Sequence, residues 1–252
     1  MNTKNVLSVL ALHLLSVVTI AYYPLSAASL ACFVLLYWIT GCLGISLGYH
    51  RLLSHRSFGA PLWVERLLGT CGALALQLGP SRWVYIHRNH HSHSDTDNDP
   101  HSPVHRGFLW GYALWLFSKR PYHAPVSPDR YYRFLDKYYA FLQLPLFALL
   151  YLVGGMGCAL WGTAVRICFV WHLSWANNAL AHSHGARAFN TADNSRNNFL
   201  LAMTTFGEGW HNNHHAFPYS ARIGLLPGQI DIGWMHIRAL EALGLAMRVK
   251  HP

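Results

Sequence analysis

Charged residues are scarce in this chain: Asp, Glu, Lys and Arg make up 12% of its 252 residues, about half the share that is usual in a soluble domain. Only ten residues are acidic, so the formal net charge is +9. A nucleic-acid-binding domain could share this basic balance, but it would not contain long uncharged apolar runs. We therefore expect an integral, multi-pass membrane protein with no nucleic-acid partner.

Cysteine is also sparse. The five cysteines all lie in apolar stretches, and no two of them form a CxxC pair. This pattern argues against a disulfide framework and against a thiolate metal site. We expect the cysteines to be small buried side chains.

Four apolar stretches approach or reach the length of about twenty residues that a bilayer-spanning helix needs. They cover residues 6–23, 27–49, 142–161 and 163–181, and form two hairpins with uncharged connections, the second turning around Gly162. Most Arg and Lys residues lie in 50–141, so the positive-inside rule places 50–141, 182–252 and both termini in the cytoplasm. The predicted fold, a single domain over residues 1–252, is an all-α integral membrane protein with four transmembrane helices and a cytoplasmic helical cap. The compactness of the chain favours a bacterial inner membrane.

Two further apolar stretches are not expected to cross the bilayer. Pro61–Gly79 contains Glu65 and Arg66, so we expect a helix that lies at the interface or packs on the cytoplasmic domain. Ile230–Val249 has helical apolar spacing and is expected to be interfacial as well.

Histidine, by contrast, is abundant, with 18 residues. Three clusters stand out, and one further histidine ends the last apolar stretch: His50-Arg-Leu-Leu-Ser-His55, His87-Arg-Asn-His90-His91, His211-Asn-Asn-His214-His215, and His182. In the two HxxHH clusters, spacings of three and four place the imidazoles on one helix face. His50 and His55 are five apart, so their convergence needs a helix end or a turn.

The number of these histidines indicates more than one metal ion. The clusters hold eight, or nine with His182, whereas a tetrahedral zinc site uses three or four ligands. Nine neutral nitrogen ligands suit two metals of higher coordination, and imidazole suits iron. We therefore predict that the cap holds a di-metal site. Carboxylates beside the clusters are expected to orient the imidazoles: Asp95, Asp97, Asp99 and Glu208.

The stretches HRLLSHRSF, HRNHHSHSDTDNDPHSP and GEGWHNNHHAFPYSAR resemble the three histidine boxes of membrane-bound fatty acyl desaturases of the Δ9 (stearoyl-type) class. The resemblance runs from about residue 40 to 235. It implies a four-span fold with a cytoplasmic di-iron site that uses O2 and two electrons to form a cis double bond in a long-chain acyl group. The iron ligands it implies are His50, His55, His87, His90, His91, His182, His211, His214 and His215, with Asn178 holding one metal through water. It also implies that Trp83 and Trp175 line the acyl tunnel.

Two departures from the animal acyl-CoA enzymes of this family bear on substrate and partner. Tyr85 and Ile86 stand where those enzymes have Arg and Asp that contact the CoA head group. The segment LGPSRWVYIHRNHH instead resembles the plant and cyanobacterial branch, some members of which act on lipid-esterified acyl groups. The expected substrate is a fatty acyl-CoA or an acyl-lipid. Because no cytochrome b5 or ferredoxin-like domain is fused, we expect a separate electron donor of ferredoxin, rubredoxin or cytochrome b5 type, with its reductase.

Two other functions remain open from the sequence. Related histidine-box proteins hydroxylate lipids or hydrocarbons with the same metals, and product analysis distinguishes the two reactions. A metal transporter or sensor is the more distant alternative. Transport sites usually lie near the midplane of the spans, whereas the only histidines within the predicted spans are His13 and His172.

Overall fold

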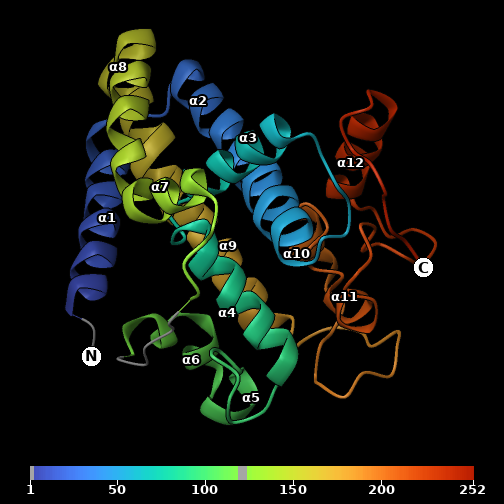
Figure 1. The fold of residues 1–252 in the computed structure, drawn as a ribbon. Helices are drawn as coiled ribbons and strands as arrows, with labels where there is room; N and C mark the ends of the chain where they lie inside the picture. The colour runs from blue at the N-terminus through green and yellow to red at the C-terminus, as the bar shows by residue number, and fades with distance from the viewer. Residues whose placement is uncertain (1–2, 119–123) are drawn as a thin grey trace.

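The computed structural model describes residues 3–118 and 124–252, which form helices joined by loops (Figure 1). Within these ranges there is no strand, and pairing is limited to isolated bridges such as Gly59 with Met247. The all-α prediction is therefore confirmed for the described residues. The helices are α1 (Thr3–Tyr22), α2 (Ala27–Tyr37), the π-helix η1 (Trp38–Ser54), α3 (Leu62–Ala73), α4 (Pro80–His93), α5 (Pro103–Arg106), α6 (Phe108–Tyr112), η2 (Leu114–Phe117), α7 (Arg130–Tyr138), η3 (Tyr139–Leu142), α8 (Gln143–Leu160), the π-helix η4 (Trp161–Val165), α9 (Arg166–Leu180), α10 (Phe199–Thr204), α11 (His211–Ala216) and α12 (Ile232–Ala242).

Three helical stretches of the described chain are long and apolar enough to cross a membrane: Thr3–Tyr22, Ala27–Ser54 and Arg130–Leu180. Their outer faces carry large apolar side chains, and Leu14 on α1 is 66% exposed. Exposed apolar surface of this extent is typical of a face that contacts lipid or a partner. The structure thus supports a membrane protein, and the second stretch is longer than the predicted 27–49.

The third stretch is not one straight helix. Its backbone leaves the helical conformation at Gly154 and Gly155, and Gly155 has a φ of +72° and a ψ of −168°, a combination open almost only to glycine. The Arg166 guanidinium donates to Oε1 of Gln143 at 3.3 Å, although 23 residues of straight helix would separate them by about 35 Å. The chain therefore reverses between them, at the end of the molecule where α8 is labelled (Figure 1).

The predicted turn around Gly162 is wrong. Gly162 lies inside the helical segment η4, where a side chain would collide with Leu150: an added Cβ would lie 2.8 Å from Cδ1 of Leu150. Because Gly162 has no side chain, the helical segments before and after the reversal can pack closely there, whereas the adjacent pair Gly154–Gly155 forms the reversal itself. The limbs are consequently 143–153 and 156–180 in place of the predicted 142–161 and 163–181.

The helix that carries the first histidine cluster has an unusual hydrogen-bonding register. Residues 38–54 form a π-helix, and the N–H of His55, the cap residue at its end, donates to the carbonyl of His50 at 3.1 Å. An i to i+5 register stacks residues five apart, and π-helical turns occur frequently at functional sites. The imidazole centroids of His50 and His55 are accordingly only 4.8 Å apart. The helix end predicted at this position is present, and the π-register explains the alignment.

Helix α3 packs lengthwise on η1. At Gly44 the two backbones are so close that an added Cβ would lie 2.4 Å from the carbonyl carbon of Cys71. Helix α3 has 12 residues, about 18 Å of helix, too short to span a bilayer. It therefore packs on the helical core, while interfacial placement of α3 and α12 remains a prediction. On α12, Ile237 is buried against η1 and Met235 is 61% exposed.

The cysteines behave as predicted. All five are free thiols, four of them buried and Cys32 partly buried.

Candidate metal centre

The structure brings all nine predicted histidines together. They form two groups, each with ligand atoms that lie within 4.8 Å of one another. The five-histidine group contains His50, His55, His87, His91 and His214, and the four-histidine group contains His90, His182, His211 and His215. The residues come from the end of η1, from α4, from the residues just after α9 and from α11.

Each HxxHH cluster contributes to both groups. In α4, His87 and His91 belong to the five-histidine group and His90 to the other; in α11, His214 belongs to the five-histidine group. Helical geometry explains the division, because residues four apart are rotated by only about 40° whereas the residue at i+3 falls about 60° to the other side of residue i. The i, i+4 pair therefore enters one group, and the i+3 histidine enters the other.

Buried carboxylates hold the outer nitrogens of several of these rings. The carboxylate of Asp95 accepts from Nδ1 of His182 at 2.8 Å, and that of Asp99 from Nδ1 of His90 at 3.0 Å. Oε2 of Glu208 lies 2.5 Å from Nδ1 of His50. Such contacts fix the ring orientation and leave Nε2 free to bind a metal. Three of the four carboxylates predicted beside the clusters thus lie in position.

Asp97 does not occupy the predicted position. Its side chain is 90% exposed, and its carboxylate lies 3.1 Å from Nδ1 of His105, which belongs to neither group. The sequence reasoning instead missed Asp193, whose carboxylate accepts from Nδ1 of His215 at 2.5 Å. Asp193 lies in a loop 22 residues before His215, so no spacing rule connects the two. The one available signal was the scarcity of acidic residues in a chain whose histidines need them.

The four-histidine group has the donor chemistry of a cation site. Because Nδ1 of His182 and of His215 donates to a carboxylate, Nε2 of each neutral ring carries a lone pair. Both Nε2 atoms lie 3.1 Å from Nε2 of His211, and one proton there can bond to only one of them. Nε2 of His90 is buried without a hydrogen-bond partner. A metal ion among these nitrogens would satisfy all four rings.

The five-histidine group converges in the same way. Nε2 of His214 lies 3.0 Å from Nε2 of His50 and 2.9 Å from Nε2 of His91, and the Nε2 atoms of His55 and His87 are 2.7 Å apart. The donor sets of both groups therefore fit metal ions.

Burial keeps several of these rings neutral, which ligation requires. Burial lowers the pKa of His87, His91, His211 and His214 well below the usual value. Burial and the neighbouring imidazoles also lower the pKa of His215 to about 4, although Asp193 opposes the shift. Uncharged imidazole is the form that binds a metal.

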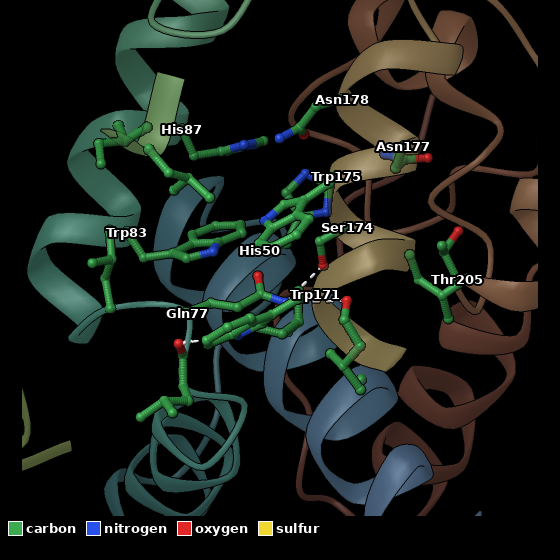
Figure 2. A pocket seen from close by; sticks show the side chains of 18 of the residues that line it. His50, Gln77, Trp83, His87, Trp171, Ser174, Trp175, Asn177, Asn178 and Thr205 are labelled. Atoms are coloured by element: carbon green, nitrogen blue, oxygen red, sulfur yellow. Dashed lines mark hydrogen bonds between the residues drawn. The ribbon is translucent and has the colours of Figure 1, made fainter. Parts of the chain in front are cut away.

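A cavity of about 300 Å³ adjoins the two groups and extends among α1, η1 and α9. Trp83 and Trp175, both predicted to line a tunnel, are in its wall, and Trp83 stacks on His87 with centroids 5.0 Å apart. Asn178 also lines the cavity, and its side chain points toward His87 (Figure 2). The remaining lining is largely apolar or aromatic.

One polar pair on the cavity wall was not foreseen. Nε2 of Gln77 donates to the hydroxyl of Ser174 at 2.7 Å (Figure 2). The indole N–H of Trp171 donates to the carbonyl of Leu76 at 3.1 Å, which anchors the chain on the N-terminal side of Gln77. These contacts join the segment after α3 to α9 across the cavity. Nothing in the local spacing of the sequence pairs residues so far apart.

Apolar helices carry two adjacent all-histidine groups beside a cavity whose wall includes several tryptophans, and this combination defines a site of the metal-binding type next to a largely apolar cavity. The family model described as fatty acid desaturase matches residues 27–222. An sn-1 stearoyl-lipid 9-desaturase of Anabaena variabilis is 46% identical over 99% of this chain and 94% of its own length. An sn-2 palmitoyl-lipid 9-desaturase of Nostoc sp. (strain 36) is 42% identical over 94% of this chain and 86% of its length. An icosanoyl-CoA 5-desaturase of Limnanthes douglasii is 42% identical over 99% of this chain and 72% of its length.

The chain belongs to the fatty acid desaturase family. It is an enzyme that desaturates fatty acyl groups, as the resemblance of its histidine clusters implied.

Proposed function

We propose that this enzyme is an O2-dependent di-iron Δ9 desaturase that forms a cis double bond in saturated long-chain acyl groups carried by membrane glycerolipids. The observation that supports the proposal most strongly is the position of the nine imidazoles. They form two groups, and four of their members, His50, His87, His90 and His211, line a cavity whose wall is largely apolar and aromatic.

The two histidine groups would each hold one iron ion, with Asn178 reaching its metal through a water molecule. Imidazole nitrogen is a suitable ligand for iron, and carboxylates on the outer nitrogens raise its basicity. When bound, the two ions would supply the oxidising power by which O2, two electrons and two protons take two hydrogens from neighbouring methylenes, yielding one C=C bond and two waters.

The protein itself would position the acyl chain and exclude water from the cavity. Trp83 stacks on His87 and lines the cavity, so one side chain touches both the proposed ligand and the acyl chain. Trp175, stacked on Trp171 with centroids 5.7 Å apart, forms part of the wall across the cavity. A chain held between these rings has its methylenes fixed relative to the histidine groups, and the apolar walls exclude water.

The lining of the cavity favours a glycerolipid as the acyl carrier. No Lys or Arg is among its described lining residues, so it offers no cationic group to the phosphates of CoA. Ile86, one of the two residues that stand where the animal acyl-CoA enzymes have CoA-contacting residues, is 5% exposed and lies in the cavity wall. Several relatives are named as lipid desaturases, and others as acyl-CoA desaturases, so acyl-CoA is the alternative that the experiment below distinguishes.

We propose four membrane crossings in a bacterial inner membrane, with the histidine groups and both termini in the cytoplasm. The reversal at Gly154–Gly155 supports this topology, because it divides Arg130–Leu180 into two limbs. The indole of Trp161 donates to the carbonyl of Tyr23 at 2.9 Å, so both hairpin turns lie at the same end of the molecule. Limb 143–153 alone is shorter than a span, so that crossing requires η3 as well. A separate ferredoxin, rubredoxin or cytochrome b5, with its reductase, would deliver the electrons.

The test is gas chromatography–mass spectrometry of total fatty acids from a bacterial host that expresses the protein, with His214→Ala as the matched inactive control. The expected product is a new monounsaturated acid with its double bond at C9, present from the wild type and absent from the control. Intact lipids and acyl-CoA are separated after a short isotope pulse, and the carrier in which the labelled monounsaturated acyl group appears first is the carrier of the substrate. A histidine-dependent hydroxy acid would show that the reaction is hydroxylation and not desaturation. A labelled monounsaturated acyl group that appears first in acyl-CoA would refute the glycerolipid carrier.

A further inference from the structure

Arg51 immediately follows a proposed iron ligand, yet it faces away from the metal centre. Its side chain is 1% exposed, among the most deeply buried charged groups of the described chain. Neighbouring residues in a helix point in different directions around its axis, so the Arg51 guanidinium leaves η1 on a different side from His50. A buried charge is costly unless its partners are complete.

The partners of Arg51 are complete. Its Nε and Nη2 donate to Oε1 of Glu208 at 3.2 and 3.1 Å. Nη2 and Nη1 donate to the two carboxylate oxygens of Asp231 at 2.9 and 3.2 Å. Nη1 also donates to the carbonyl of Ala221 at 2.8 Å. These contacts use all five N–H groups of the guanidinium.

Asp231 anchors this network to the C-terminal part of the chain. Its carboxylate caps α12 by accepting from the N–H of Trp234 at 2.8 Å. It also accepts from the N–H groups of Ile223 and Gly224 at 2.7 and 3.1 Å. Asp231 is 4% exposed. The carboxylate is thus held in one orientation by backbone groups that belong to no histidine cluster.

Glu208 connects the network to the metal centre. Its Oε1 accepts from Arg51 and from the hydroxyl of Ser46, while Oε2 lies 2.5 Å from Nδ1 of His50. The two oxygens have separate partners, so Arg51 fixes the rotation that aims Oε2 at His50.

We propose that Arg51 and Asp231 are positioning residues for the five-histidine group. They act through Glu208, which orients His50. The four-histidine group has its own carboxylates on Asp95, Asp99 and Asp193, so the effect of Arg51 and Asp231 is confined to one of the two proposed irons. This inference rests on the di-iron function proposed above.

The test measures iron release and not turnover. Purified wild type, Arg51→Lys and Asp231→Asn are loaded anaerobically with 57Fe(II), titrated with a chelator, and followed by Mössbauer spectroscopy and metal analysis. Arg51→Lys keeps the charge but loses the planar fork; Asp231→Asn keeps the shape but loses the charge. We expect each variant to release one iron at a roughly tenfold lower chelator concentration, the lower end of the range for outer partners of metal ligands. The second iron is expected to release as in the wild type.

Asp193→Asn is the matched contrast, because it weakens the other group. The Mössbauer component that disappears first in Asp193→Asn should be the one that persists in Arg51→Lys, because the two variants weaken different irons. If folded Arg51→Lys and Asp231→Asn release both irons at the same chelator concentrations as the wild type, the proposal is overturned. Early release of both irons together would also overturn it, because it indicates a general structural role. If Arg51→Lys fails to fold, Asp231→Asn alone decides. A wild type that binds no iron would refute the proposed function instead.

Discussion

Asp193 accepts a hydrogen bond from Nδ1 of His215 at 2.5 Å, although Asp193 lies in a loop outside the sequence clusters. The same carboxylate accepts from the N–H of Ser195 at 3.0 Å, so the loop holds it in place. Burial raises the pKa of Asp193, but the bond to His215 outweighs it, and the pKa lies far below its usual range. Asp193 is therefore an ionised partner that orients a proposed ligand.

The first prediction follows from this pair. Asp193→Asn keeps the shape of the side chain but removes its charge, so we expect iron affinity to fall by about 10–100-fold, as is typical when an outer partner of a metal ligand is lost. The measurement is a chelator titration of the iron-loaded protein. Asp97→Asn is the control, because Asp97 contacts neither histidine group, and it should titrate as the wild type. Identical curves for the two variants would contradict the assignment of Asp193.

A second prediction separates ligand histidines from their neighbours. His91 belongs to the five-histidine group, whereas His93, two residues on, lies outside both groups and its ring contacts the carbonyl of Asn89 at 3.1 Å. We expect His91→Ala to lose iron and to lower desaturation by more than about 100-fold, beyond the loss for an outer partner. His93→Ala should keep both. Retained iron in folded His91→Ala would remove it from the ligand set.

The third prediction concerns chain length. Gly41 lines the cavity, and an added Cβ would lie 2.9 Å from the ring of Phe206, so Gly41→Val narrows the space for the acyl chain. We expect the ratio of 18-carbon to 16-carbon products to fall about tenfold, since one methylene in a tight pocket is worth at least that factor. Fatty acid analysis of expressing cells measures the ratio. Ala31→Val, at an exposed position on α2, should leave it unchanged; equal ratios in both would argue against this cavity as the acyl site.

A fourth prediction tests the reversal. Gly155 has a φ of +72° and a ψ of −168°, so Gly155→Ala should destabilise the folded protein by about 1–3 kcal/mol, the usual cost of a strained backbone conformation. The readout is the melting temperature of the purified protein in detergent. Val153→Ala, where the side chain is 74% exposed, should cause a much smaller change. An unaltered melting temperature for Gly155→Ala would place the reversal elsewhere.

The sequence alone predicted those parts of the site that depend on local geometry. The HxxHH spacing placed three imidazoles on one face of a helix because helical periodicity acts within one or two turns. The lengths of the apolar stretches indicated membrane-spanning helices, because bilayer thickness fixes the helix length that a span requires. Trp83 and Trp175 could be expected in the cavity wall because the histidine-box resemblance aligned them with a known pattern.

Tertiary structure decided how these local units combine. Helical geometry separates the i+3 histidine from the i, i+4 pair within each cluster, but which histidines of α4 share a group with which histidines of α11 depends on how the two helices face each other. Asp193 reaches His215, and Asp231 reaches Arg51, only because loops distant in sequence pack against the metal centre. The choice of Gly154–Gly155 over Gly162 for the reversal likewise depended on packing, since Gly162 is needed where two limbs touch. Sequence spacing encodes contacts within a helix, whereas contacts between distant segments arise only from the complete set of packed surfaces.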